Sequence, residues 1–319
     1  MTIRAVLYRA RGEDETVELR HDTKIAIRND QLLWVDIEGR DAEELRRAAH
    51  VVGLEDAALR RLERTDRRAR ILRLPERVVL TLGAVDAEDP EARRRELDIV
   101  VGANHVITVH EGPLSAVEGY GNDLAEEREV GKLDAASFTA GVLDAVFTAY
   151  FRQIERIERD IDALDEIAVG SAGSDDFLDK VLAIRRRIAR LRRALAPNRE
   201  ALLPLARPDF ELRQDLGPVW PGIIERLERA IDSVENAREL LIGSFDLYLG
   251  RASQRTNDVM KALTMISAIF LPGIILAGVM GMNFKLGFFD QPSNFFLVIA
   301  AMIVSAAAIL AVARWRRWI

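Results

Sequence analysis

The sequence predicts an α+β domain joined to a long helix and two membrane-spanning helices. Two uncharged apolar runs near the C-terminus, residues 262–282 and 295–313, are each long enough to cross the ~30 Å hydrocarbon core of a bilayer as a helix. Apolar residues recur at three-to-four spacing from Pro221 into the first run, and no other proline occurs before Pro272. Upstream, short β-rich segments alternate with helical patterns.

The first third of the chain has the pattern of a mixed α/β domain. Residues 41–52 and 55–63 show helical spacing, whereas residues 86–95, with Pro90 and many charges, predict a solvated loop. A Gly-Ala-Asn sequence at 102–104 is typical of a hairpin turn. We therefore expect an α/β domain over residues 1–134. Its strands are predicted at 3–8, 33–37, 77–82, 97–101 and 105–110.

Residues 135–217 predict a helical hairpin that belongs to the same soluble part of the chain. Apolar residues keep helical spacing from Phe147 to Leu164, residues 169–174 break the pattern with glycine and serine, and residues 177–195 resume it. Acidic residues surround the break, and arginines crowd the second arm. This alternation of charge is typical of a solvated helix surface.

A single helix is predicted over residues 218–282. From Pro221 to Met282 it would be roughly 90 Å long at about 1.5 Å per residue, which is too long for a compact domain. It must be a stalk that continues into the first membrane span. A loop at residues 283–294, a second span at 295–313 and a basic tail at 314–319 complete the predicted organisation.

Basic residues beside the two spans predict the orientation. Arginine and lysine favour the cytoplasmic side, and the loop between the spans holds only Lys285 and Asp290. The N-terminus reaches charged residues within a dozen positions, so we expect no signal peptide. Both termini are therefore expected in the cytoplasm, with the spans in the inner (plasma) membrane. The flanking basic residues are Arg251, Arg255, Lys261, Arg314, Arg316 and Arg317.

One face of the long helix is small, polar or acidic except at Met260, Leu271 and Ile274, and we call it the polar seam. Small residues in membrane helices usually mark close helix packing. Asp246 and Asn257 oppose that interpretation, because in a dry helix interface their polar groups would be buried without partners. If this face instead lined a hydrated axis, water would supply those partners. Two spans cannot enclose a channel, so we expect a closed ring of copies. The polar seam comprises Glu239, Gly243, Asp246, Gly250, Ser253, Asn257, Met260, Thr264, Ser267, Leu271, Ile274, Gly278 and Gly281.

Composition excludes several classes of function. A net charge of −6 gives no basic face for nucleic acid. The absence of cysteine excludes disulfides and thiolate metal sites, and the four histidines lack ligand spacing, although oxygen-ligated metals remain open. No phosphate-binding loop and no nucleophile elbow occurs, so we expect neither an enzyme nor a resident cofactor.

Three segments of the long helix resemble the CorA family of divalent-cation channels: residues 246–264, 270–272 and 278–284, the last containing Gly281-Met282-Asn283. The likeness extends to Tyr150-Phe151 and to residues 195–200, and more faintly to Trp34-Val-Asp36. The Gly-Met-Asn sequence gains its specificity from its position at the end of a span with the stalk sequence before it.

The resemblance implies a funnel-shaped homopentamer with an α/β sandwich in the cytoplasm, stalk helices and an axial pore. Gly281, Met282 and Asn283 would form the selectivity filter, where neutral oxygens hold a hydrated Mg²⁺ ion without stripping its water. Met260 and Leu263 match an apolar constriction and Asn257 a polar ring below it. The other expected pore-lining residues are Thr264, Ser267, Leu271, Ile274 and Gly278.

Several positions depart from the family pattern. Ile274 stands where many members have threonine, Leu271 replaces a common methionine, and the loop after the filter lacks the usual acidic residue. Gly222 replaces an acidic residue of the regulatory Mg²⁺ site, which leaves Asp246 with Asp86 or Asp89 as weak candidate partners. These departures resemble the zinc-transporting ZntB branch.

The leading hypothesis is a pentameric channel that passes Mg²⁺, and also Co²⁺ and Ni²⁺, into the cytoplasm. Its partners would be other copies of the chain, the lipid bilayer and the divalent cation, with no nucleic acid. A Zn²⁺ importer coupled to protons is the alternative on the same scaffold. A membrane-tethered sensor or enzyme domain is the remote alternative, since an anchor would not need a polar seam running into the span.

Overall fold

The computed structural model describes residues 3–9, 14–19, 27–28, 30–65, 68–126, 134–170, 175–206, 220–282, 291 and 293–316. They form two compact units. The first, which we call the α/β unit, comprises residues up to Glu166 together with Asp175–Phe245. The second, which we call the span unit, comprises Ile167–Ser174 and the residues from Asp246 onward.

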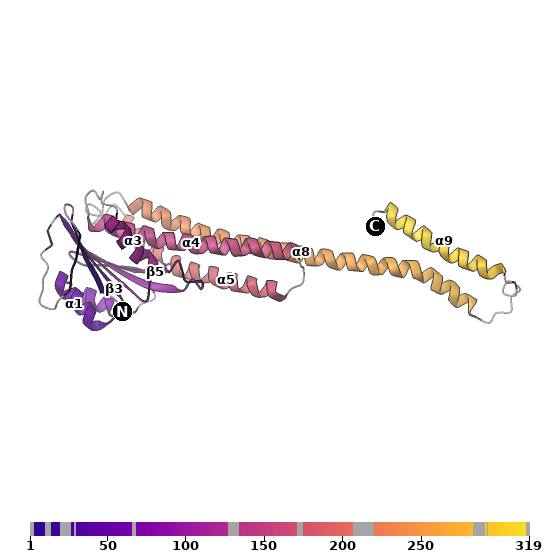
Figure 1. The fold of residues 1–319 in the computed structure, drawn as a ribbon, viewed down its shortest axis with the longest axis horizontal. Helices are drawn as coiled ribbons and strands as arrows, with labels where there is room; N and C mark the ends of the chain where they lie inside the picture. Colours follow the sequence, from indigo (N-terminus) through magenta and orange to yellow (C-terminus); the bar gives the residue numbers. More distant parts are fainter. Residues whose placement is uncertain are drawn as a thin grey trace. The chain divides into compact units, whose positions relative to one another are not determined.

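A seven-stranded mixed sheet forms the centre of the α/β unit (Figure 1). The strand order is β2-β1-β3-β7-β6-β5-β4, with β3 and β7 parallel and all other neighbours antiparallel. All five predicted strands and the turn between the last two are confirmed, while β2 and β4 were not predicted. The strands are β1 Ile3–Arg9, β2 Glu15–Thr16, β3 Gln31–Glu38, β4 Arg70–Arg73, β5 Val78–Val85, β6 Arg94–Val101 and β7 His105–His110.

Helices cover both faces of this sheet. On one face, α1 (Ala42–Val52) and α2 (Asp56–Leu62) bury Leu45 and Leu62 against inward residues of β3 and β7. On the other face, the ring of Phe138 lies 5.5 Å from that of Trp34 and 5.3 Å from that of Tyr120 in α3 (Ser115–Glu126). Because both faces are covered, the central strands are apolar on both sides, which explains their nearly continuous apolar sequence.

The predicted helical hairpin is confirmed as α4 (Ala135–Gly170) and α5 (Asp175–Leu195), which lie side by side in Figure 1. An ion pair between Asp160 and Arg187 joins the two arms. The short helix α6 (Asn198–Leu202) and the 3₁₀ turn η1 (Leu203–Ala206) follow α5.

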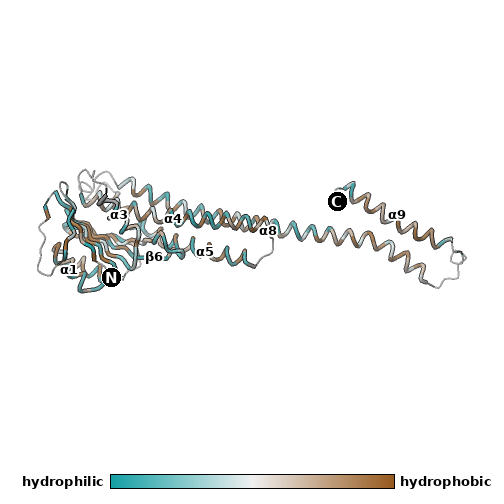
Figure 2. The backbone as a smooth tube through the Cα atoms, in the orientation of Figure 1, coloured by the Kyte–Doolittle hydropathy of each residue, from teal (hydrophilic) through white to brown (hydrophobic). Residues whose placement is uncertain are grey.

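The predicted long helix is α8, Trp220–Met280, with Pro221 in its first turn, where the missing N–H costs nothing, and Pro272 inside it. The last helix is α9, Ser293–Trp315. Both contain a stretch long and apolar enough to cross a membrane, and Figure 2 shows the hydrophobic colouring over α9 and the C-terminal part of α8.

The prediction of a solvated loop at residues 86–95 is only partly right, because Glu88, Pro90, Glu91 and Arg93 are exposed but other residues of the loop are buried. Asp86 is 7% exposed and Ala92 is fully buried, and β6 already begins at Arg94. The reason is Gln153 of α4, whose Nε2 donates to the carbonyl oxygens of Asp86, Ala87 and Asp89 at 2.8, 3.0 and 2.8 Å. The backbone of a charged loop is therefore held against the core by a residue distant in sequence, while the side chains of Glu88, Glu91 and Arg93 are exposed.

Asn198 links the hairpin to the sheet through Gly83 of β5. Strand β4 pairs with β5 only as far as Thr81, so Gly83 would otherwise present an unpaired edge. The Asn198 carboxamide completes the ladder: Gly83 N–H donates to Oδ1 and Nδ2 donates to Gly83 O, both at 2.8 Å. Tyr150 donates to the same carbonyl at 2.9 Å, and burial raises the pKa of Tyr150, which keeps the donor protonated. A side chain at position 83 would collide with the carbonyl of Ala194.

We predict that Asn198→Ala lowers the free energy of unfolding by about 2 kcal/mol, because it leaves the Gly83 N–H buried without a partner. Thermal melting of the detergent-solubilised protein measures this loss. Asn236→Ala, at an exposed position of α8, is the matched control and should melt as the wild type does. Equal melting of the two variants would contradict a structural role for Asn198.

Candidate pore-lining face of α8

The expected pore-lining residues lie on an exposed face of α8 in the single chain. Met260, Leu263, Leu271 and Ile274 are 55%, 56%, 57% and 64% exposed, values unusual for large apolar side chains in a folded protein. The small and polar members of this set are exposed as well: Asn257, Thr264, Ser267, Gly278 and Gly281.

From Met265 to Met280 the opposite face of α8 is covered by α9, whereas residues 253–264, which include Asn257, Met260 and Leu263, are exposed on all sides of the helix. An ideal Cβ on Gly273 would lie 3.2 Å from Cε of Met302, which marks a close approach of the two helices. The covered side chains form a heptad stripe of small and apolar residues. This stripe comprises Met265, Ala268, Ile269, Pro272, Gly273, Leu276 and Met280, all partly buried.

Helical geometry puts these two faces on opposite sides. Each residue turns the helix by about 100°, so positions 260, 267, 274 and 281 lie about half a turn away from positions 265, 269, 272 and 276. Thr264 stands at the border, because it lines a cavity of about 210 Å³ between α8 and α9. Its hydroxyl donates to the carbonyl of Met260 at 2.7 Å.

The same division holds for α8 within the α/β unit. The residues that α8 buries there recur every three or four positions, from Trp220 through Leu227 and Val234 to Leu241. Glu239 and Gly243 of the polar seam lie on the opposite side and are exposed. Among the described residues, therefore, other elements pack against one side of α8 over 220–244 and 265–280, and they leave the polar seam uncovered.

The glycines of α8 fall into two kinds. A Cβ on Gly243, Gly250 or Gly278 would meet no atom within 4 Å, whereas one on Gly273 would meet Met302. Gly273 thus serves close packing within the chain. In the described part of the chain, no other element comes this close to Gly243, Gly250 or Gly278. If these glycines serve close helix packing, their partner must be another copy of the chain.

The end of α8 forms the start of the expected filter. The Gly281 N–H donates to the carbonyl of Ala277 at 2.9 Å and the Met282 N–H to that of Val279 at 3.2 Å, which closes the last turn. Asn283, the residue expected to offer an amide oxygen, lies outside the described residues.

The carboxylates expected at the regulatory Mg²⁺ site differ in how free they are to bind a metal ion. Asp246 is exposed, and Gly222 offers no side chain. Asp86 is buried and accepts hydrogen bonds from Ser115 Oγ at 2.7 Å and from the Glu88 N–H at 3.1 Å. Asp89 accepts from the N–H groups of Glu91 and Arg93, so both loop carboxylates already have donors. Within the described ranges, no group of three or more His, Asp or Glu side chains could hold a metal ion.

The chain is similar to known divalent-cation transporters. Over 210 residues the chain is 27% identical to the cobalt/magnesium transport protein CorA of Thermotoga maritima, a match that covers 65% of the chain and only 60% of that relative. The CorA of Methanocaldococcus jannaschii is 22% identical over 305 residues, which cover 93% of the chain and 94% of the relative. The divalent cation transporter CmaX of Pseudomonas aeruginosa is 29% identical over 220 residues, 66% of the chain and 63% of the relative.

Solved structures share the fold. The complete structure of the M. jannaschii CorA magnesium transporter superposes with a TM-score of 0.77 at 20% identity, covering 98% of both chains. The model of the family described as CorA-like Mg²⁺ transporter protein matches residues 29–314. Since that match takes in five of the seven strands (β3 to β7), the hairpin, α8 and nearly all of α9, the protein is a membrane protein of the CorA-like family of divalent-cation transporters.

Proposed function

We propose that this protein is a homopentameric, funnel-shaped channel that passes Mg²⁺, and also Co²⁺ and Ni²⁺, into the cytoplasm. The observation that carries the proposal is the polar seam, which stays exposed on α8 while α9 covers the opposite face. A ring of α8 helices with their seams inward would line a hydrated axis. The names of the relatives, which are cobalt/magnesium and divalent-cation transporters, support the choice of ion.

In this proposal both termini lie in the cytoplasm, the loop after Met282 faces outward, and the filter is Gly281, Met282 and Asn283. A hydrated Mg²⁺ ion needs oxygen groups that grip its water shell without replacing it, since Mg²⁺ dehydrates reluctantly. The backbone carbonyl of Gly281 and the amide of Asn283 are neutral groups of this kind.

Flux into proteoliposomes tests the choice of ion and separates the two candidate functions. A channel of the proposed kind takes up Mg²⁺ down its gradient, with or without a pH difference. The alternative, a Zn²⁺ importer coupled to protons, is favoured by the apolar Leu271 and Ile274 in mid-span. Zn²⁺ uptake that requires an inward proton gradient, with no Mg²⁺ uptake, would replace the first function by the second.

We predict that Asn283→Ala reduces divalent-cation uptake to background while the oligomer still assembles. The amide oxygen is the one side-chain ligand of the proposed filter able to hold a hydrated ion. Asn294→Ala, in the first turn of α9 and outside the filter, is the control. Wild-type uptake by the intact Asn283→Ala oligomer would show that the filter lies elsewhere.

We predict that Met260→Ser, Leu263→Ser and their Asp counterparts raise the resting leak severalfold. A constriction that closes by excluding water depends on apolar walls, and a hydroxyl or carboxylate there retains water. Leak of a trapped divalent-sensitive dye from liposomes measures the effect. If the leak of both variants stays at the wild-type level, the gate lies higher, at Leu271 and Ile274.

We predict little closure of the channel by cytoplasmic Mg²⁺. A strong site between subunits needs more than one carboxylate, because Mg²⁺ keeps most of its waters and gains little from each contact. Gly222 contributes none, and Asp86 and Asp89 are engaged in their own loop. Protease protection of α8 across a Mg²⁺ titration checks this. Strong, saturable protection that disappears in Asp246→Ala would overturn the prediction.

A further inference from the structure

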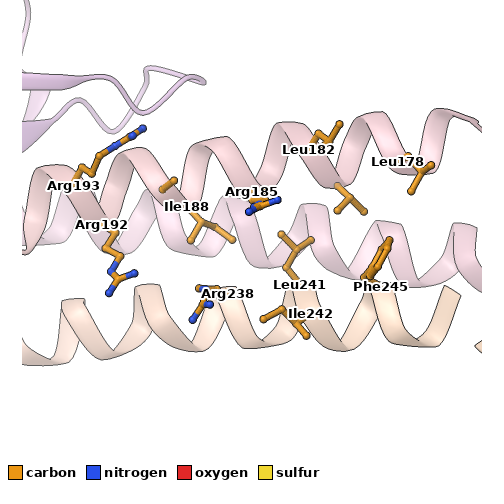
Figure 3. Close-up of a pocket in the computed structure, with 12 residues that line it drawn as sticks. Leu178, Leu182, Arg185, Ile188, Arg192, Arg193, Arg238, Leu241, Ile242 and Phe245 are labelled. Carbon is orange, nitrogen blue, oxygen red and sulfur yellow. The ribbon is translucent and has the colours of Figure 1, made fainter. Parts of the chain in front are cut away.

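A groove runs between α5 and α8 on the surface of the α/β unit, with a volume of about 690 Å³ (Figure 3). Apolar side chains of both helices line it at the end nearer the hairpin turn, and arginines line it at the other end. Leu178 and Leu182 of α5 are 43% and 44% exposed, and Ile242 of α8 is 47% exposed. Contiguous apolar surface of this kind in a soluble unit marks an interaction site.

The arginines of the groove differ in their partners. Arg192 and Arg238 both pair with Glu235, at 2.8 and 3.6 Å. Arg185 and Arg193 are exposed, and neither forms an ion pair with any residue in the described ranges. A partner that fits this groove therefore has an apolar part and carries negative charge to Arg185 and Arg193.

A surface of opposite charge lies on α4 of the same chain. Glu155, Glu158, Asp162 and Glu166 recur at three-to-four spacing, and we call them the acidic stripe. Exposed Ala163 adjoins it. No residue of the acidic stripe forms an ion pair with another described side chain.

The register of α4 against α5 places the arginines of the groove and the acidic stripe at matching positions along the axis of the hairpin. Asp160 pairs with Arg187, and each step forward along α4 is one step back along α5, because the arms are antiparallel. Arg185 is therefore level with Asp162, and Arg193 is level with the residue next to Glu155. A neighbouring copy related by rotation about an axis parallel to these helices has each residue at the same position along that axis.

We propose that the groove between α5 and α8 receives the acidic stripe of a neighbouring copy, with Arg185 facing the neighbour's Asp162 and Arg193 the neighbour's Glu155. A closed ring needs a head-to-tail interface made of two different, complementary surfaces on each copy. The groove and the acidic stripe are two such surfaces on different helices. This inference rests on the proposed function, which requires a ring of copies. It identifies the surfaces through which adjacent copies contact each other outside the pore.

Cysteine crosslinking tests the contact directly, because the chain has no native cysteine. Leu182→Cys is placed in one tagged full-length chain and Glu166→Cys in a second, differently tagged chain, and the two are co-expressed in membranes. A disulfide between the two tags must join different copies. We expect this crosslink to form on mild oxidation, and Arg186→Cys with Glu166→Cys, one position outside the groove, to crosslink at least about tenfold less. Equal yields, or no crosslink in an intact ring, would overturn the proposal.

Charge reversal tests the energetics in the detergent-solubilised full-length protein. Arg185→Glu with Arg193→Glu should lower the ring fraction about tenfold or more at low salt, because like charges face each other across the contact. Adding Glu155→Arg and Asp162→Arg should restore it. Arg186→Glu, an exposed arginine beside the groove, should assemble as the wild type does.

The outcomes separate this inference from the proposed function. Charge-reversed rings that assemble and conduct normally would overturn the groove contact and leave the channel intact. A wild-type protein that is monomeric in mild detergent and in membranes would overturn both. Loss of a co-purifying fatty acid from Arg185→Glu/Arg193→Glu, without loss of assembly, would assign the groove to an anionic amphiphile and overturn the proposal.

Discussion

The rest of the structure depends on the two-sided character of α8. A helix repeats every 3.6 residues, so the chain can bury one stripe of α8 over 220–244 and 265–280 and leave the opposite stripe for other neighbours. The buried stripe includes Leu227 and Leu241 in the α/β unit, and Gly273 contacts Met302 in the span unit. The polar seam lies on the opposite side, which the described part of the chain leaves uncovered.

The α/β unit supports α8 through polar contacts that are buried and matched. Arg40 donates to Glu96 at 2.9 Å and pairs with Asp98 at 2.7 Å, and Thr81 bonds both Asp98 and Arg61. Buried charges of equal number and opposite sign avoid the large cost of an unpaired ion, although they add little net stability. Asn198 then ties the hairpin to Gly83, so the helices that pack against α8 are anchored in the sheet.

Much of the fold follows from periodicity alone, and the failures have identifiable causes. Five strands, α1, α2, the hairpin and α8 all have strong local patterns. Strand β2 has only two residues and β4 only four, too few to show a period. The loop at 86–95 looked solvated because its charges are local, while Gln153, which holds its carbonyl groups, is more than sixty residues away.

Some features of the candidate site could likewise be predicted from the sequence, and others depend on the tertiary structure. The sequence by itself determined the two stretches long and apolar enough to cross a membrane, the long helix and the face on which the polar seam lies, since these depend only on residue type and helical period. Only the tertiary structure decided that α9 covers the face opposite that seam, that Gly273 rather than Gly278 serves packing, and that Asp86 already has donors. Each of these depends on a partner from another element, and one sequence pattern carries no record of which distant side chain will supply it.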